Sequence, residues 1–266
     1  MNKLKSSIYE INCMNNLASE DKWVNNIHPL VKLIITITYI SFVVSFHKYD
    51  ITEIIGMVIY PIVIFITGYI SFKDSLRRLR LVLPLVCFVG IFNPFFDRDI
   101  LMKLNGVNIS GGTISMITLM IKGILTVLAS YLLIATTTIE KICYAMSLIH
   151  IPKIFVTQIL FIYRYITLLL NEANRITEAY SLRAPNQKGI HYKVWGSLIG
   201  QLLLRSMDRA ENIYESMSLR GYVGEFYYTY NIKCSLKDYL YFITWISIFL
   251  AMRFFPILEF IGNIFV

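Results

Sequence analysis

The stretch Ile114–Thr136 reads ISMITLMIKGILTVLASYLLIAT, and Lys122 is its one charged residue. A helix needs roughly 20 mostly apolar residues to cross the hydrocarbon core of a bilayer. This stretch is long and apolar enough to do so, and it therefore predicts a transmembrane helix.

Four further apolar blocks occur along the chain: Leu30–Phe46, Ile51–Phe72, Leu81–Phe96, and Tyr239 to about Val266. The third of these contains Pro84 and ends at Asn93-Pro94, so we expect a kinked or tilted helix there. The last block carries charged residues and a proline beyond its middle. Together with the first stretch, these blocks predict about five transmembrane helices.

The composition agrees with a membrane protein. Of the 266 residues, 56% are hydrophobic and 16% are charged, whereas a soluble domain carries about 25% charged residues. These values argue against a soluble enzyme, a disordered chain and a disulfide-rich secreted module. The four cysteines are far apart and form no CxxC pair, so neither a zinc site nor a disulfide framework is indicated. We expect an all-α integral membrane protein without a cleavable signal peptide.

The net charge of +8 could indicate nucleic acid binding. The basic residues flank the apolar blocks, however, which is typical of cationic cytoplasmic loops facing anionic lipid. We therefore expect the lipid bilayer, and no nucleic acid, as a partner.

The basic residues also predict orientation. The segment between the second and third blocks holds four cations and one acid: Lys73, Asp74, Arg77, Arg78 and Arg80. Such an excess indicates the cytoplasmic side. The segment 97–113 has balanced charges and fits the outer side. The prediction is a multi-pass protein of the cell membrane with a cytoplasmic N-terminus.

The middle third of the chain has a different pattern. Its apolar part, Ile154–Leu170, contains Gln158 and Arg164, and an arginine in mid-membrane costs at least about 3 kcal/mol. We interpret this part as an amphipathic helix at the inner interface. The predicted division is an N-terminal membrane domain (1–136), a cytoplasmic coupling-helix domain (137–238) and a C-terminal membrane helix (239–266).

This middle third contains an internal repeat. The run Ala173-x-x-Ile176-x-Glu178-x-x-Ser181-Leu182-Arg183-Ala184 recurs 37 residues later as Ala210-x-x-Ile213-x-Glu215-x-x-Ser218-Leu219-Arg220-Gly221. Six of the twelve positions are identical. A helix breaker follows each copy, so each copy predicts a helix that ends in Ser-Leu-Arg and a small residue.

The two arginines have two interpretations. Each could simply favour the negative end of its own helix dipole. That role does not explain why Ser-Leu precedes each arginine or why a small residue follows it. A small residue at this position lets the backbone of another protein approach closely. Leucine and guanidinium together suit a docking contact. The predicted docking residues are Ser181, Leu182, Arg183, Ala184, Ser218, Leu219, Arg220 and Gly221.

Nearly the whole chain resembles a known family, the transmembrane (T) components of energy-coupling factor transporters, of the CbiQ type in cobalt systems. The resemblance rests on these residues and segments: His28-Pro29-Leu30-Val31-Lys32-Leu33, Ile151-Pro152-Lys153, Gln158, Tyr163-Arg164-Tyr165, Glu172 and the two arginine tips. In that family two Ala-Arg-Gly motifs dock into grooves on two ATPase subunits. This chain departs from the motif with Leu-Arg-Ala and Leu-Arg-Gly. The resemblance implies two ATPase subunits and a substrate-binding membrane subunit as partners. It implies cobalt as the solute, with nickel or a vitamin as alternatives, because scaffolds of this family also serve nickel and vitamin systems.

Catalytic and ligand motifs are absent from the sequence. No G-x-x-x-x-G-K-[ST] motif occurs, so we expect no enzymatic activity, no cofactor, and ATP hydrolysis in partner subunits. The four histidines are isolated, which predicts no metal site and makes His28 and His150 turn or interface residues. Solvated pairs within one helix account for the charges around Glu172 and Arg205. Lys122 could extend to the interface or face a partner.

Two alternatives remain open at this stage. A self-contained secondary transporter would have broken helices around polar groups at mid-membrane, and it would take up solute without an ATPase. A membrane-bound lipid-modifying enzyme would need converging acids or histidines, and the purified chain would convert a lipid.

Overall fold

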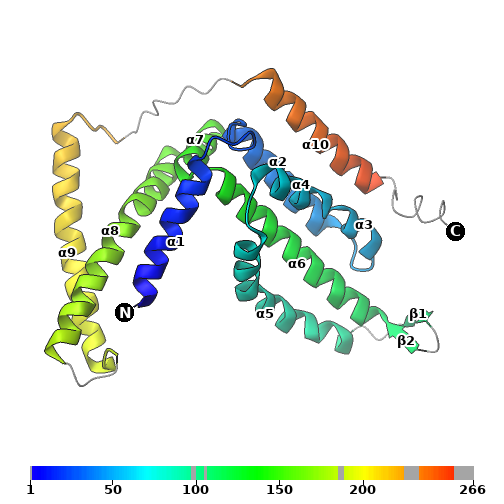
Figure 1. Ribbon diagram of the computed structural model, residues 1–266, viewed down its shortest axis with the longest axis horizontal. Coiled ribbons are helices and arrows are strands. Elements are labelled where there is room, and N and C mark those ends of the chain that lie inside the picture. Colours follow the sequence, from blue (N-terminus) through cyan, green and yellow to red (C-terminus); the bar gives the residue numbers. More distant parts are fainter. Residues whose placement is uncertain (1, 97–99, 105–106, 185–188, 225–233, 255–266) are drawn as a thin grey trace. The chain divides into compact units, whose positions relative to one another are not determined.

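The computed structural model describes residues 2–96, 100–104, 107–184, 189–224 and 234–254 (Figure 1). Within them the chain forms ten helices and one two-stranded hairpin. The chain divides into two compact units. Unit 1 comprises Met1–Leu17 and Ile139–Asn231, and unit 2 comprises Ala18–Thr138 and Ile232–Val266.

Unit 2 is built around one long helix, α6 (Gly111–Thr136), which contains the stretch Ile114–Thr136. The other elements of this unit are α2 (Pro29–Ser45), α3 (Ile51–Gly56), α4 (Ile59–Gly68), α5 (Phe72–Phe96), β1 (Ile100–Leu104), β2 (Val107–Ser110) and α10 (Leu236–Phe254). Helix α6 contacts α2, α3, α4 and α5, and α10 contacts α2 and α3.

Among the residues that the structure describes, three segments are long and apolar enough to cross a membrane: Ile51–Gly68, Gly111–Thr136 and Lys153–Arg183. Two shorter apolar helical segments are Pro29–Ser45 and Val82–Pro94. These findings confirm the all-α membrane fold. The predicted block Ile51–Phe72 corresponds to the apolar span Ile51–Gly68. A turn at Met57 and Val58 divides it into α3 and α4, and it ends before Tyr69, whose φ is 48°. Of the C-terminal block, the residues from 255 onward lie outside the described residues.

Two predicted loops have regular structure. The basic segment after the second block is the first part of α5, which begins at Phe72 and continues through Pro84 and Pro94 to Phe96. The sequence suggested that these positive charges lie on a loop. They lie on a helix instead. In segment 97–113, β1 pairs with β2 in an antiparallel hairpin, the one β structure among the described residues.

An aromatic cluster joins α2, α4 and α10. The ring of Tyr39 lies 4.5 Å from that of Tyr60 and 5.4 Å from that of Phe249, measured between centroids. Trp245 meets Tyr60 edge to face at 4.8 Å. All four side chains are buried. Aromatic pairs at these separations add to the free energy gained by burying the rings, so the cluster holds the C-terminal helix against the N-terminal ones.

Buried polar residues fix the helix ends of unit 2. The carboxylate of Asp238 accepts the backbone N–H of His28 at 3.0 Å and that of Ser235 at 2.8 Å. The ammonium of Lys32 donates to the carbonyl of Thr136 at 2.8 Å, at the end of α6. A cation at this position is stabilised by the negative end of the helix dipole.

Lys122 has a similar role at another helix end. Its Nζ donates to the carbonyl of Val44 at 3.2 Å and to that of Phe46 at 2.5 Å. Phe46 is the C-cap residue of α2. The contact decides the question that the sequence left open, because Lys122 satisfies carbonyls at the end of a neighbouring helix in its own chain.

Unit 1 contains α1 (Asn2–Ser19), α7 (Ile139–Leu148), α8 (Lys153–Arg183) and α9 (Tyr192–Leu219). Helices α8 and α9 run in opposite directions (Figure 1) and contact each other. The apolar part Ile154–Leu170 and the polar part that follows it form one continuous helix, α8. Helix α7 lies against α8, while Cys143 on α7 is fully buried.

Candidate functional site

The repeat forms the C-terminal ends of α8 and α9. Helix α8 ends at Arg183, with Ala184 as its C-cap residue. Helix α9 ends at Leu219, with Arg220 as its C-cap residue. Both copies therefore end a helix at Ser-Leu-Arg, as the sequence predicted, and the two ends differ in register by one residue. We call residues 181–184 the first tip and residues 218–221 the second tip.

The second tip ends in a Schellman motif. Gly221 has φ of +84°, a conformation that favours glycine. Its N–H donates to the carbonyl of Ser218 at 3.0 Å, and the N–H of Tyr222 donates to that of Met217 at 3.0 Å. These are the two hydrogen bonds of the motif. The glycine is therefore required by the backbone of the tip itself, a reason that the sequence analysis did not consider.

The first tip ends differently. Ala184 has φ of −130°, and its N–H donates to the carbonyl of Tyr180 at 3.1 Å. This φ lies outside the left-handed region that favours glycine. Residues 185–188 lie outside the described residues. The departure from Ala-Arg-Gly at this tip is thus compatible with its own backbone.

Both tips expose their leucine and their arginine. Leu182 is 82% exposed and Leu219 is 90% exposed. Arg183 and Arg220 are exposed as well, and neither guanidinium has a hydrogen bond or ion pair with any described residue. Arg183 stands in the last turn of α8 and Arg220 at the C-cap of α9, where a cation also suits the helix dipole. Ser181 donates its hydroxyl to the carbonyl of Glu178 at 2.8 Å, within its own helix.

The two copies differ just before their tips. Glu178 of the first copy forms an ion pair with Lys5 of α1 at 3.2 Å and accepts from the amide of Asn174 at 2.9 Å. Its counterpart Glu215 is exposed and has no ion pair among the described side chains. Helix α1 thus contacts the first copy of the repeat one turn before its tip.

The tips lie at opposite ends of the α8–α9 pair. Glu172 of α8 pairs with Arg205 of α9, and residues that precede Glu172 lie beside residues that follow Arg205. The helices are therefore antiparallel. Helix α9 has 28 residues, so at 1.5 Å per residue the tips are roughly 40 Å apart along the pair.

The ion pair between α8 and α9 corrects an expectation. We expected Arg205 to pair within its own helix, but it binds Glu172 across the helix pair. Glu172 also meets Arg175 on its own helix at 3.9 Å. Within the described part of the chain, the set Arg205, Asp208 and Glu211 makes no ion pair of its own. Sequence spacing alone could not reveal a pair 33 residues apart.

The histidines occupy turns and helix ends. His28 and His191 are N-cap residues whose side chains accept the N–H of Leu30 and of Lys193. His150 lies in the turn that follows α7, with φ of +65°. The expectation that His28 and His150 are turn or interface residues is confirmed.

No group of three histidines, cysteines or acids that could hold a metal ion occurs among the described residues. Burial, and secondarily the charge of Glu140, raises the pKa of Cys143 to about 11. That thiol is therefore protonated at neutral pH.

The chain matches a known protein family over most of its length. The match is to CbiQ, described as cobalt transport protein, and it covers residues 20–228. The chain belongs to the CbiQ family. The resemblance derived from the sequence is thereby confirmed, and membership makes the chain a membrane component of cobalt transport. The CbiQ family is a transport family and not a known family of enzymes.

A relative from Methanocaldococcus jannaschii is 27% identical over 227 residues, which are 80% of this chain and 76% of the relative. That relative is described as uncharacterised. The family match therefore carries the assignment to CbiQ.

Proposed function

We propose that this CbiQ-family chain is the transmembrane scaffold of an energy-coupling factor importer. In this role it transmits ATP-driven motion from two ATPase subunits to a substrate-binding membrane subunit that takes up cobalt. Residues 181–184 and 218–221 are the ATPase-docking sites. The domains 1–136, 137–238 and 239–266 are the N-terminal membrane domain, the coupling layer and the C-terminal membrane helix.

The observation that carries the proposal is the pair of exposed leucine–arginine ends. Leu182 and Leu219 expose most of their surface at the ends of two helices with the same Ser-Leu-Arg sequence. Each leucine stands beside an arginine that has no partner among the described residues. Arginine is enriched where a few residues supply most of the binding energy of an interface. Two copies of one such end support docking onto two equivalent grooves.

The antiparallel helices constrain how the coupling layer meets the membrane. The tips are roughly 40 Å apart, more than the thickness of the hydrocarbon core. If α8 and α9 spanned the membrane, the tips would lie on opposite sides, whereas helices along the membrane surface let both tips reach cytosolic partners. The exposed Gln158 and Arg164 on α8 favour this placement, because both would face lipid in a spanning helix.

The test is charge reversal at each tip in the complete transporter. Arg183→Glu or Arg220→Glu should weaken co-purification of the ATPase subunits and lower cobalt uptake, while the chain stays in the membrane. Loss of a buried charged anchor costs about 2–5 kcal/mol. Because the two contacts act together, the double variant should lose the ATPase subunits almost completely.

Lys237→Glu is the matched control, since it makes the same charge change at an exposed position of α10, outside the α8–α9 pair. It should leave co-purification and uptake at the original level. Unchanged co-purification and uptake in both tip variants would refute the docking role. Uptake by this chain without any ATPase would instead support a secondary transporter.

A further inference from the structure

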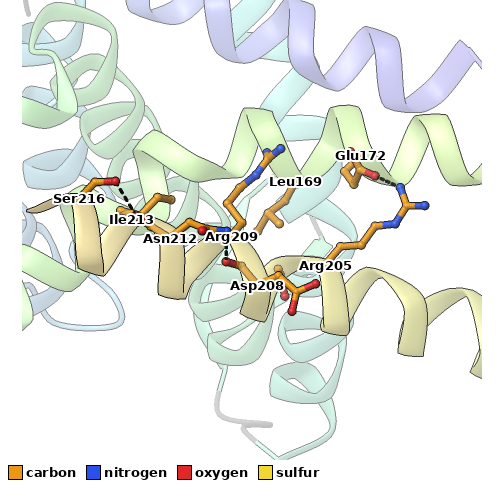
Figure 2. A pocket seen from close by; sticks show the side chains of 9 residues that line it. Leu169, Glu172, Arg205, Asp208, Arg209, Asn212, Ile213 and Ser216 are labelled. Carbon is orange, nitrogen blue, oxygen red and sulfur yellow. Dashed lines mark hydrogen bonds and ion pairs between the residues drawn. The ribbon is translucent and has the colours of Figure 1, made fainter.

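A cleft of about 440 Å³ lies between α8 and α9 in unit 1. Its polar lining, shown in Figure 2, includes Glu172, Arg205, Asp208, Arg209, Asn212 and Ser216. Asn212 and Ser216 donate to carbonyls of their own helix, and Arg205 is held by Glu172. Most of the polar groups of the cleft are therefore already engaged within the protein.

Arg209 is the exception among the cations of the cleft. Its side chain extends from α9 toward α8, whereas the carboxylate of Asp208 points away from α8 (Figure 2). No described residue forms a hydrogen bond or an ion pair with the Arg209 guanidinium. The cleft thus presents one cation whose donors are available to a bound anion.

An apolar trough of about 420 Å³ adjoins the polar cleft. It is lined by Phe161, Tyr165, Leu168, Ile213, Tyr214 and Met217. Leu169, Ser206, Arg209 and Ile213 belong to both linings. The guanidinium of Arg209 therefore lies at the boundary between the polar cleft and the apolar trough.

We propose that this composite cleft binds an anionic phospholipid of the inner leaflet. Its phosphate accepts hydrogen bonds from Arg209, and one acyl chain occupies the trough. Guanidinium is suited to phosphate because its planar donors match the oxygen atoms. The combination of a phosphate-binding cation and an adjacent apolar trough fits an amphiphile, and the inner leaflet supplies anionic ones. The proposal rests on the placement of α8 and α9 along the membrane surface.

Binding can be measured on the full chain in detergent, without ATPase subunits, so that the result is independent of docking. Native mass spectrometry should detect phosphatidylglycerol retained on the chain in preference to phosphatidylcholine. Arg209→Gln should lower retention of phosphatidylglycerol about tenfold, the change expected when a hydrogen bond to a charged group is lost. Lys193→Gln, which removes a cation from the same helix outside the cleft, should leave retention unchanged.

Two further arms separate the possible ligands. Glycerol phosphate, which has the headgroup chemistry and no acyl chain, should fail to displace phosphatidylglycerol at equal concentration. Met217→Asn at the trough should reduce retention without altering the helix content seen by circular dichroism. Equal retention of both lipids, or an undiminished preference in Arg209→Gln, would overturn the proposal. Displacement by glycerol phosphate would show that the site takes a free phosphate instead.

Discussion

Gly221 and Ala184 occupy the same position in the two copies of the repeat, yet their backbones differ. Gly221 has φ of +84° in the Schellman motif that ends α9, whereas Ala184 has φ of −130°. An L-residue in the left-handed region costs about 1–2 kcal/mol relative to glycine. The small residue therefore has a conformational reason at the second tip and none at the first.

Gly221→Ala is expected to loosen the last turn of α9. With a cost of about 1 kcal/mol, local opening should increase about fivefold, which hydrogen exchange at the amides of Gly221 and Tyr222 would show. Ala184→Gly is the matched control, because it introduces no such strain at the end of α8. Unchanged exchange at the second tip would mean that the motif does not hold that end.

At this scale the sequence predicted part of the site. The repeated Ser-Leu-Arg was sufficient to place both helix ends, because helix breakers are local signals. The contact of Lys122 with Phe46 and that of Asp238 with His28 could not be predicted, since these partners lie 76 or more residues away. The hydrogen bond between Lys32 and Thr136, which joins residues 104 apart, is of the same kind.

The helices α8 and α9 contact each other, and one ion pair among the described residues joins them. Glu172 is mostly buried, with a side-chain exposure of 13%, and its partner Arg205 is 51% exposed. Pairs near a surface contribute roughly 0.2–1 kcal/mol. The contribution is modest, but this pair fixes the register of two long helices.

Arg205→Gln should lower the thermal unfolding temperature of the full chain in detergent by a few degrees, because a mostly buried Glu172 loses its partner across the pair. Glu215→Gln on the same helix should leave that temperature unchanged, since Glu215 is exposed. Differential scanning fluorimetry measures both. Equal unfolding temperatures in the two variants would show that the pair does not join the helices.

The elements of unit 2 were largely predictable because apolar blocks of membrane length are the strongest signal a sequence carries. Their boundaries were less so. A basic run between two such blocks suggested a loop, but Phe72–Phe96 is one helix. The charge pattern did not distinguish the two, because a cluster of basic residues can lie on the first turns of a helix as well as on a loop. The turn between α3 and α4 follows Gly56, and Pro61 lies in the first turn of α4; sequence reasoning did not use these two local signals.

For the whole molecule, the decisive property is the side of the membrane on which each tip stands. Helix α8 is long and apolar enough to span, and if it did, antiparallel packing would put the tips on opposite sides. Arg183→Cys and Arg220→Cys, each in a chain without other cysteines, should react with a membrane-impermeant maleimide in inside-out vesicles only.

Lys103→Cys serves as the outer control, since segment 97–113 is predicted to face outward, and it should react in intact cells. Reaction of the Arg183→Cys chain in intact cells would show that α8 crosses the membrane. The proposed coupling layer would then be wrong, because one docking end would be out of reach of a cytosolic ATPase.

The separation of the tips also limits the kind of motion that the chain can transmit. A helix resists shortening along its axis because every turn is closed by backbone hydrogen bonds. If two attached motors approach each other, α8 and α9 cannot compress to follow them. One helix must therefore slide or rotate against the other. The Glu172–Arg205 ion pair, midway between the two tips, is the contact that has to break during this motion.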